Sequence, residues 1–199
     1  MKKVRKRSGK AGLPPGAMVQ VGRDGTDGTS IRLFTYDEGG YTENNIENIA
    51  GVDPVGQLGT VRWLDIDGLN SERILRTTGE LFDLHSLLLE DVLNTDHRPK
   101  VEEYQNALFV VVKMLGLDSE TGGIHMEQVC FVLRQGLVIS FEERPGDVLD
   151  PIRQRIRQDT GRVRRAGADY LLYSLLDVIV DHYFLIVEDL GERIEELER

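Results

Sequence analysis

Three nearly continuous apolar segments in the middle of the chain most constrain its fold. Residues 107–115, 128–133 and 137–142 are rich in Val, Ile, Leu and Phe, and each has the length of a β-strand. Strands without polar alternation are typical of a sheet that is covered on both faces. The last two segments flank Gln135 and Gly136, which predicts a hairpin. The chain is therefore expected to bury a sheet between two other layers.

Further strands and helices are predicted around this central region. Strand patterns occupy residues 17–21, 30–37 and 59–67, after a turn or linker at residues 12–16. Helices are predicted from the cap Ser71 to about Thr78, from the cap Asp83 to Leu93, and from the cap Asp150 with Pro151 to about Gln158, where Gly161 suits the end. Interleaved strands and helices favour a layered α/β sandwich with a mixed sheet over residues 12–165.

From residue 166 onward the pattern becomes that of one long helix. Apolar residues recur at steps of three and four, at Leu172, Leu176, Ile179, Tyr183, Val187, Leu190, Ile194 and Leu197. This heptad-like spacing predicts a seam for a partner helix. At ~1.5 Å per residue, residues 168–199 would extend about 48 Å. The pattern continues to the last residue, so we expect a piece of a longer protein.

Charge and composition narrow the class of protein. Residues 1–10 carry six Lys and Arg and no acid, which predicts a solvated, disordered tail over residues 1–11. The rest has 34 acidic and 18 basic residues, which disfavours nucleic acid as a partner and is compatible with cations. The chain has a single cysteine, Cys130, which suits a reducing cytosol. We expect its thiol to be buried and to act as a small hydrophobic side chain. No apolar run is expected to reach the roughly 20 residues that span a bilayer.

Two adjacent acids, Glu90 and Asp91, are the first candidate metal ligands. They end a short apolar helix, where the helix dipole disfavours negative charge, so their placement points to a function. Carboxylates are hard donors that suit Mg²⁺ and Ca²⁺ and tolerate Co²⁺ or Mn²⁺. We expect Asp91 at the surface, before a polar turn. The alternative interpretation is a solvated acidic surface without a ligand.

The long helix carries further acids. Asp177 and Asp181 lie one turn apart, and Glu188, Glu192 and Glu195 extend the acidic side. His182 is next to Asp181 and would be a ligand for a softer ion, although its role stays open. The alternative is the solvated face of an amphipathic helix. No phosphate loop, dinucleotide motif or nucleophile elbow is present, so we expect no enzyme, with a carboxylate-based hydrolase as a minor alternative.

Four segments resemble the cytosolic domain of CorA-type magnesium and cobalt transporters. They are residues 62–67 (RWLDID), 89–100 (LEDVLNTDHRPK), 142–153 (EERPGDVLDPIR) and 168–177 (ADYLLYSLLD). The resemblance covers about residues 12–199. It implies a three-layer α/β/α sandwich with a mixed sheet, followed by long helices that lead to the membrane. It also implies a homopentamer at the cytoplasmic face of the cell membrane, attached only through a C-terminal part beyond Arg199.

The resemblance assigns roles to three acids. The family's regulatory dication ligand falls on Asp91, and Glu90 and Asp177 match positions of a second nearby ion. Mg²⁺ or Co²⁺ bound between neighbouring subunits would hold the closed state, and zinc transporters of the same superfamily remain a variant of this reading. The alternative is a free-standing soluble module that binds a metal or a partner. Carboxylates alone do not decide which dication is transported, nor the oligomeric state of this chain.

Overall fold

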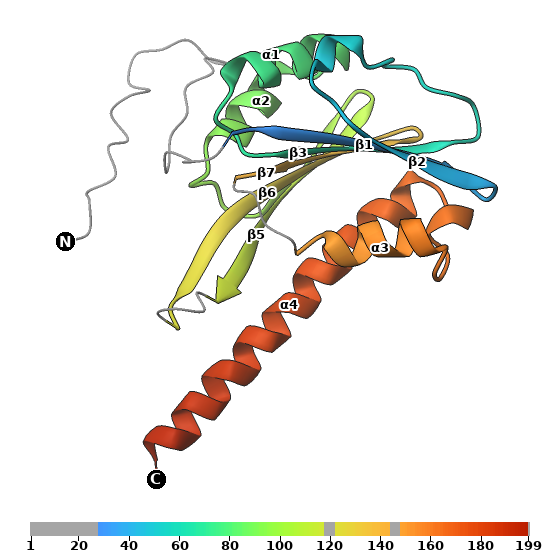
Figure 1. Ribbon diagram of the computed structural model, residues 1–199. Helices are drawn as coiled ribbons and strands as arrows, with labels where there is room; N and C mark the ends of the chain where they lie inside the picture. Colours follow the sequence, from blue (N-terminus) through green and yellow to red (C-terminus); the bar gives the residue numbers. More distant parts are fainter. Residues whose placement is uncertain (1–27, 118–121, 144–147, 199) are drawn as a thin grey trace, which may run out of the picture.

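A central sheet with helices on both faces forms the fold (Figure 1). The computed structural model describes residues 28–117, 122–143 and 148–198. Helices α1 (Glu72–Leu81) and α2 (Ser86–Leu93) cover one face, and α3 (Asp150–Gln158) and the first part of α4 (Ala168–Leu197) cover the other. The predicted α/β/α sandwich with a long final helix is confirmed. The predicted tail, the linker at 12–16 and the strand at 17–21 lie outside the described residues.

The sheet is mixed, as predicted, with the strand order β2-β1-β3-β7-β6-β5-β4. Its strands are β1 (Ser30–Asp37), β2 (Gly40–Asn45), β3 (Val61–Asp67), β4 (Lys100–Tyr104), β5 (Ala107–Leu117), β6 (Ile124–Arg134) and β7 (Leu137–Glu142). The central strands β3 and β7 are parallel, and all other neighbours are antiparallel. The predicted β6–β7 hairpin is present. The two edge strands, β2 and β4, were not predicted.

Each face of the sheet has its own hydrophobic core, which explains the continuous apolar strands. On β3, Leu64 packs with the leucines of α1 and α2, whereas its neighbour Trp63 packs with α3 and α4. Phe141 and Phe131 likewise belong to opposite cores and are fully buried. Successive residues of a strand point to opposite faces, so both sets must be apolar when both faces are covered.

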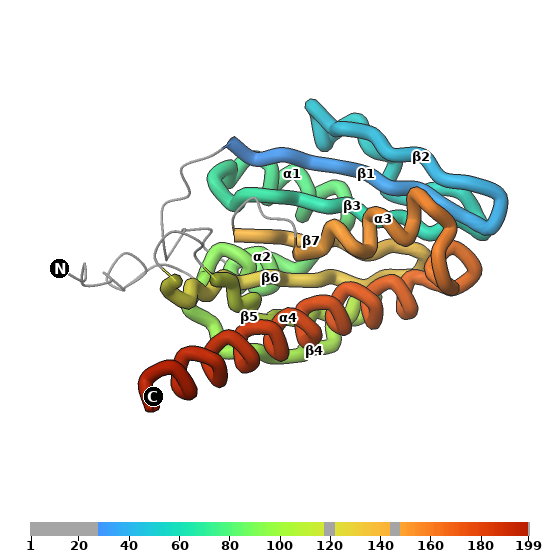
Figure 2. Tube along the Cα trace, turned by 60° about the horizontal axis from the view of Figure 1, so that its bottom comes forward, coloured from blue at the N-terminus to red at the C-terminus, as the bar shows by residue number. Residues whose placement is uncertain are grey.

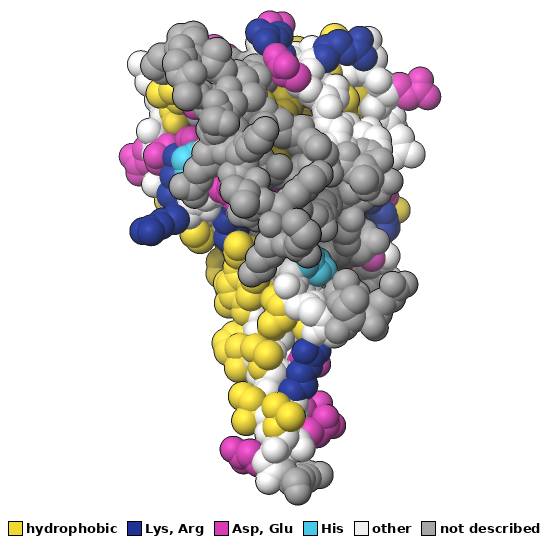
Figure 3. All heavy atoms as spheres, turned by 90° about the vertical axis from the view of Figure 1, so that its left-hand side faces the viewer, with side chains coloured by type: hydrophobic (Ala, Val, Ile, Leu, Met, Phe, Trp, Pro, Cys, Tyr) yellow, Lys and Arg dark blue, Asp and Glu magenta, His cyan; other side chains and the backbone are white. Residues whose placement is uncertain are grey.

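Helix α4 crosses the sheet along β5 and β6 and continues past α3 (Figures 1 and 2). Its first half is buried on the sheet through Leu171, Leu175 and Ile179. Farther along, apolar side chains are exposed and follow the protruding helix (Figure 3), namely Val180, Phe184, Leu185, Val187, Leu190, Ile194 and Leu197. The predicted seam is therefore divided, because its first members pack on this chain's own sheet instead of a partner helix.

By length and composition, α4 is also the one helix in the described part of the chain that would be able to cross a membrane. The expectation concerned a continuous apolar run of roughly 20 residues. Asp177 and Asp181 interrupt the run in α4, so the helix meets the length and average composition of a membrane span without containing such a run. The apolar side chains of the first half serve to pack α4 on the sheet.

Two of the predicted helix starts needed correction. Ser71 caps α1 as predicted, by accepting a hydrogen bond from the Ile74 backbone N–H. Helix α2 begins two residues later than expected, because His85 and not Asp83 is its cap. Asp83 instead adopts a left-handed conformation with φ of 49° in the turn before the helix. A residue at positive φ reverses the chain here and does not start a helix.

Helix α3 ends where predicted, but the residues that cap its two ends differ from the prediction. Leu149 is its N-cap, and the Asp150 side chain makes no capping bond, although Pro151 lies in the first turn as expected. The left-handed residue that ends the helix is Asp159, with φ of 52°, two residues before the predicted Gly161. Aspartate tolerates this conformation better than most residues, so the glycine was not needed at that position.

Candidate metal-binding site

The C-terminus of α2 carries the first two predicted ligands on a firmly packed support. Leu88, Leu89, Val92 and Leu93 are all buried against the sheet. Glu90 and Asp91 lie between these anchors and are partly buried. The position of the two carboxylates is therefore fixed by the apolar residues on either side of them.

Asp91 is already engaged by two neighbouring side chains. Its Oδ2 atom lies 2.7 Å from Lys100 Nζ, and its Oδ1 atom lies 2.6 Å from His97 Nε2. Only 16% of the side chain is exposed. Asp91 is thus only partly exposed at the surface where it was expected, because the polar turn after α2 folds back and brings His97 and Lys100 onto the carboxylate.

Lys100 bridges two carboxylates at the start of edge strand β4. Besides Asp91, its Nζ atom donates to Glu102 Oε1 at 2.9 Å, and Glu102 also accepts from the Tyr104 hydroxyl at 3.2 Å. Burial acts to lower the pKa of Lys100, but the hydrogen bonds to both carboxylates outweigh burial and raise it. The Lys100 hydrogen bond lowers the pKa of Glu102. Asp91, Lys100 and Glu102 thus form a charged group in which one cation serves two anions.

The backbone of Asp91 is also tied to the sheet. Its carbonyl accepts from Gln128 Nε2 at 3.0 Å, and Gln128 Oε1 accepts from Lys113 Nζ at 3.0 Å. Lys113 Nζ also donates to the Thr95 carbonyl at 2.7 Å. The last carbonyls of a helix need partners, and a cation near them complements the helix dipole. At the end of α2, Gln128 on β6 supplies the hydrogen-bond partner and Lys113 on β5 supplies the cation.

The third predicted ligand, Asp177, lies in a different layer. It is on α4, half-buried, whereas Glu90 and Asp91 are on α2 across the sheet. Asp181 and the glutamates farther along α4 are exposed, and His182 is partly buried. The predicted three acids are not among the groups of close ligand atoms found in the described residues. Within one chain, therefore, the structure does not bring them together.

A different group of acids, not singled out from the sequence, does come together. Asp65, Asp67 and Glu142 are buried with ligand atoms within 4.8 Å of one another, the one such group among the described residues. Asp65 and Asp67 are two apart on β3 and share a face, and Asp67 is in register with Glu142 on β7. The i, i+2 spacing in the RWLDID segment was a usable signal for this pair.

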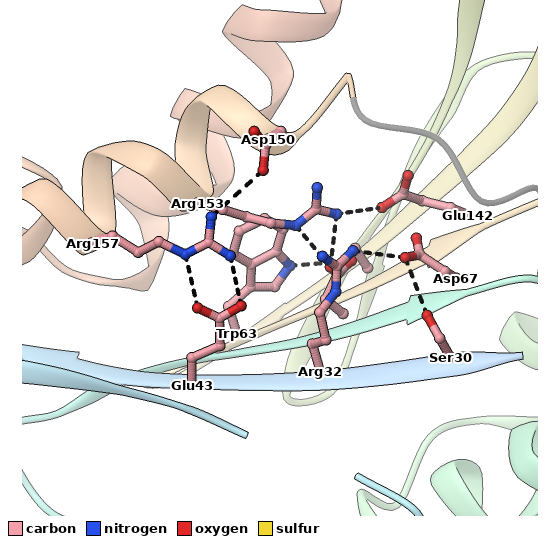
Figure 4. A network of polar contacts seen from close by, with 11 residues as sticks. Ser30, Arg32, Glu43, Trp63, Asp67, Glu142, Asp150, Arg153 and Arg157 are labelled. Carbon is pink, nitrogen blue, oxygen red and sulfur yellow. Dashed lines mark hydrogen bonds and ion pairs between the residues drawn. The ribbon is translucent and has the colours of Figure 1, made fainter. Parts of the chain in front are cut away.

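Two arginines close this acidic group (Figure 4). Arg153 on α3 is fully buried and lies 2.8 Å from Asp65 and 3.7 Å from Glu142. Arg32 on β1 lies 2.7 Å from Asp67 and 3.2 Å from Asp65. Ser140 donates to Asp65 at 2.7 Å, and Trp63 donates to Ser140. The two guanidinium groups therefore place positive charge beside all three acids.

Burial changes the titration of this acidic group. Burial, and then the charges of Asp65 and Asp67, raise the pKa of Glu142 well above its ordinary value. Burial, and then the charge of Asp65, raise the pKa of Asp67. Because Asp65 and Asp67 are paired with the two guanidinium groups, we assign this group as a structural ion network.

Comparison with known proteins places the fold and these residues in context. The family of CorA-like Mg²⁺ transporter proteins matches residues 59–199. The chain is 39% identical over 191 residues to the cobalt/magnesium transport protein CorA of Thermotoga maritima, covering 96% of this chain and 54% of that protein. It is 28% identical over 140 residues to the putative metal ion transporter YfjQ of Bacillus subtilis, covering 68% of this chain and 41% of that protein. The chain thus spans about half the length of these relatives or less.

Solved structures share the same fold at low sequence identity. The soluble domain of CorA from Methanocaldococcus jannaschii aligns with a TM-score of 0.62 at 16% identity, over 83% of this chain and 62% of that one. The ZntB cytoplasmic domain from Vibrio parahaemolyticus aligns with a TM-score of 0.67 at 15% identity, over 85% and 65%.

Proposed function

This chain belongs to the family of CorA-like Mg²⁺ transporter proteins, and on that premise we propose that it is the cytosolic metal-sensing domain of a divalent-cation transporter. In this proposal Mg²⁺ or Co²⁺ binds between neighbouring subunits and stabilises the closed state. The observation that carries the proposal is the rigid placement of Asp91 at the end of α2, with its backbone tied to strands that contact α4.

The donor chemistry fits such an ion. Glu90, Asp91 and Asp177 offer carboxylate oxygens, which are the ligands that Mg²⁺ prefers and Co²⁺ accepts. A bound dication would supply positive charge between carboxylates that otherwise repel each other. Because Glu90 and Asp91 lie across the sheet from Asp177, a site that used all three would be completed by a second copy of the chain. This supports a homo-oligomer, which we propose to be a pentamer.

A continuous set of hydrogen bonds supports a route from this site to α4. The Asp91 carbonyl accepts from Gln128, Gln128 accepts from Lys113, and the Lys113 carbonyl accepts from the Tyr183 hydroxyl on α4. A change in the position of α2 would therefore change the contacts that hold the long helix. Ligand binding that favours one arrangement of such a connection over another shifts the population of the two states.

The proposed cellular context follows from the family. We place the domain at the cytoplasmic face of the membrane, with transport carried out by parts of the protein that this chain does not span. Its role is then regulatory and not enzymatic. Sensing by a small number of carboxylates implies weak binding, on the order of 10⁻⁴–10⁻³ M.

The proposal is tested by titrating the 199-residue chain with Mg²⁺ in a calorimeter and by sedimentation with and without Mg²⁺. We expect millimolar-range binding, Mg²⁺-dependent self-association, and about a tenfold weaker affinity in Asp91→Asn, because one charged ligand is lost. Glu72→Gln removes an exposed carboxylate from α1 and is the matched control, expected to bind like the wild type. Equal Mg²⁺ affinity in Asp91→Asn and the wild type would reject the site.

A further inference from the structure

We propose that Lys100 is a built-in competitor that sets the dication concentration at which the Asp91 site fills. This inference rests on the proposed function, because it assumes that Asp91 is a dication ligand. Its physical basis is that the ammonium group of Lys100 lies 2.7 Å from Asp91 Oδ2, at hydrogen-bonding distance. An ion that binds this oxygen directly must first displace Lys100.

The surroundings of Lys100 allow it to leave Asp91 without losing all its partners. Its Nζ atom is already 2.9 Å from Glu102, whose side chain is 42% exposed and held by Tyr104. The ammonium also lies 5.8 Å from the centre of the Phe109 ring, within cation–π range. Lys100 itself is 24% exposed, so water reaches it. Displacement by a metal therefore transfers the ammonium to Glu102 and solvent and does not bury an unpaired charge.

The charge of Lys100 acts against a dication even after it has moved aside. Two charges a few ångströms apart at a partly exposed site attract or repel each other with a free energy that corresponds to about a tenfold change in an equilibrium constant. Lys100 thus opposes the ion twice, by occupying a donor oxygen and by repelling the incoming charge. The consequence is a site that stays in its lysine-bound form at low Mg²⁺ and changes to its metal-bound form only at high Mg²⁺.

This arrangement gives a sensor a defined resting state. If Lys100 were absent, Asp91 would lose the partner of its Oδ2 atom whenever the metal was absent, and only the contact of its Oδ1 atom with His97 would remain. With it, Asp91 is paired in both states, and the two states differ in which cation it holds. The exchange of one cation for another keeps α2 anchored while the ligand changes.

The test is the Mg²⁺ dissociation constant of Lys100→Met, measured by calorimetry on the whole 199-residue chain at one fixed protein concentration. Methionine keeps the length of the side chain and removes the charge. We expect the dissociation constant to fall about tenfold. Lys100→Arg keeps the charge and should stay within about twofold of the wild type. Arg76→Met removes the exposed partner of Glu72 on α1 and controls for net charge.

A double-mutant cycle separates this inference from the proposed function. In an Asp91→Asn background, Lys100→Met should tighten Mg²⁺ binding less than it does in the wild-type background, because competition for the charged oxygen is lost and only the repulsion between the lysine and the ion remains. If Asp91→Asn weakens binding but Lys100→Met leaves the dissociation constant unchanged, Lys100 is not a competitor and the site stands. If neither substitution changes binding, the site itself is wrong.

Folding of the variants is checked by circular dichroism and thermal unfolding. Should Lys100→Met fail to fold, Lys100→Gln provides the same comparison, because its amide retains a hydrogen-bond donor toward Asp91 without a charge. An unchanged dissociation constant in folded Lys100→Gln would overturn the inference equally. A lower constant in Lys100→Gln and a wild-type constant in Lys100→Arg would establish that the charge is responsible.

Discussion

The hydroxyl of Tyr183, on α4, donates a hydrogen bond to the backbone carbonyl of Lys113, on β5. Strand β4 pairs with β5 only as far as Val111, so the carbonyl of Lys113 lies on a stretch of strand edge that β4 does not reach. A strand edge presents backbone groups that need partners. This one hydrogen bond therefore gives the Lys113 carbonyl a partner and attaches α4 to the sheet.

Replacing Tyr183 by phenylalanine should loosen this contact without changing the shape of the core. We expect the free energy of unfolding to fall by about 0.5–1.5 kcal/mol, the usual net contribution of one hydrogen bond. Amide hydrogen exchange should also increase in the second half of α4. Tyr173→Phe, at an exposed position of the same helix, is the control and should stay within about 0.5 kcal/mol of the wild type. Equal effects of the two substitutions would contradict the docking role.

Removing Arg153 should be among the most damaging changes in the chain. Its guanidinium is fully buried between Asp65 and Glu142, so Arg153→Met leaves carboxylates uncompensated inside the protein. Breaking a buried ion pair from one side costs about 3–5 kcal/mol. Urea unfolding monitored by tryptophan fluorescence measures this loss. Arg165→Met, which removes a half-exposed partner of Asp159, should cost under about 1 kcal/mol.

The raised pKa of Glu142 predicts a particular pH dependence of stability. Its pKa is raised in the folded chain, so the folded state holds a proton that the unfolded state has released above its ordinary pKa. At a pH below its pKa in the unfolded chain, Glu142 is protonated in both states and does not lower the free energy of unfolding. As the pH rises from the pKa of the unfolded state toward the pKa of the folded state, Glu142 lowers the free energy of unfolding progressively. The slope approaches about 1.4 kcal/mol per pH unit for one proton.

Glu142→Gln removes this proton uptake and is the direct test. The variant should be as stable as the wild type near pH 4 and increasingly more stable than it toward pH 8, measured by urea unfolding at each pH. Glu103→Gln, on edge strand β4, is an exposed control that should leave the wild-type slope intact. A constant difference between Glu142→Gln and the wild type across this range would mean that Glu142 is charged.

The single thiol should be chemically silent in the folded protein. Cys130 is 1% exposed, and burial raises its pKa to about 12, so almost no reactive thiolate is present. Iodoacetamide should modify it only after unfolding, at a rate that follows the unfolded population. Fast modification under native conditions, measured by mass spectrometry, would contradict the burial of this strand.

Periodicity was sufficient to predict the elements that are buried and not those at the edges. The strands β5, β6 and β7 contain long apolar runs, whereas β1 and β3 mix apolar and charged residues; all five were predicted. The edge strands have the sequences Gly40–Asn45 (GYTENN) and Lys100–Tyr104 (KVEEY), which are polar and have little to bury. Their conformation is imposed by pairing with β1 and β5, a tertiary effect that local propensity does not contain.

The structure confirms the predicted helix end that carries Glu90 and Asp91, but the contacts around it could not be predicted. The carboxylates of Glu90 and Asp91 follow from the sequence, as does their place at the end of a helix. That Asp91 is held by Lys100, nine residues away, depends on how the turn after α2 returns to the sheet. The same limit applied to α4, where spacing identified an apolar seam but not that the sheet of the same chain covers its first half.

Among the described residues, two polar contacts between the outer half of α4 and the β5–β6 hairpin end on main-chain atoms. Tyr183 binds the carbonyl of Lys113, and Arg193 Nη1 binds the carbonyl of Gly122 at 2.6 Å, near the start of β6. Every amino acid carries a carbonyl, so mutations in the β5–β6 hairpin that preserve its backbone leave both acceptors in place. As far as these two contacts are concerned, selection acts on the two donor residues of the helix and not on the side chains of the two acceptor residues in the hairpin.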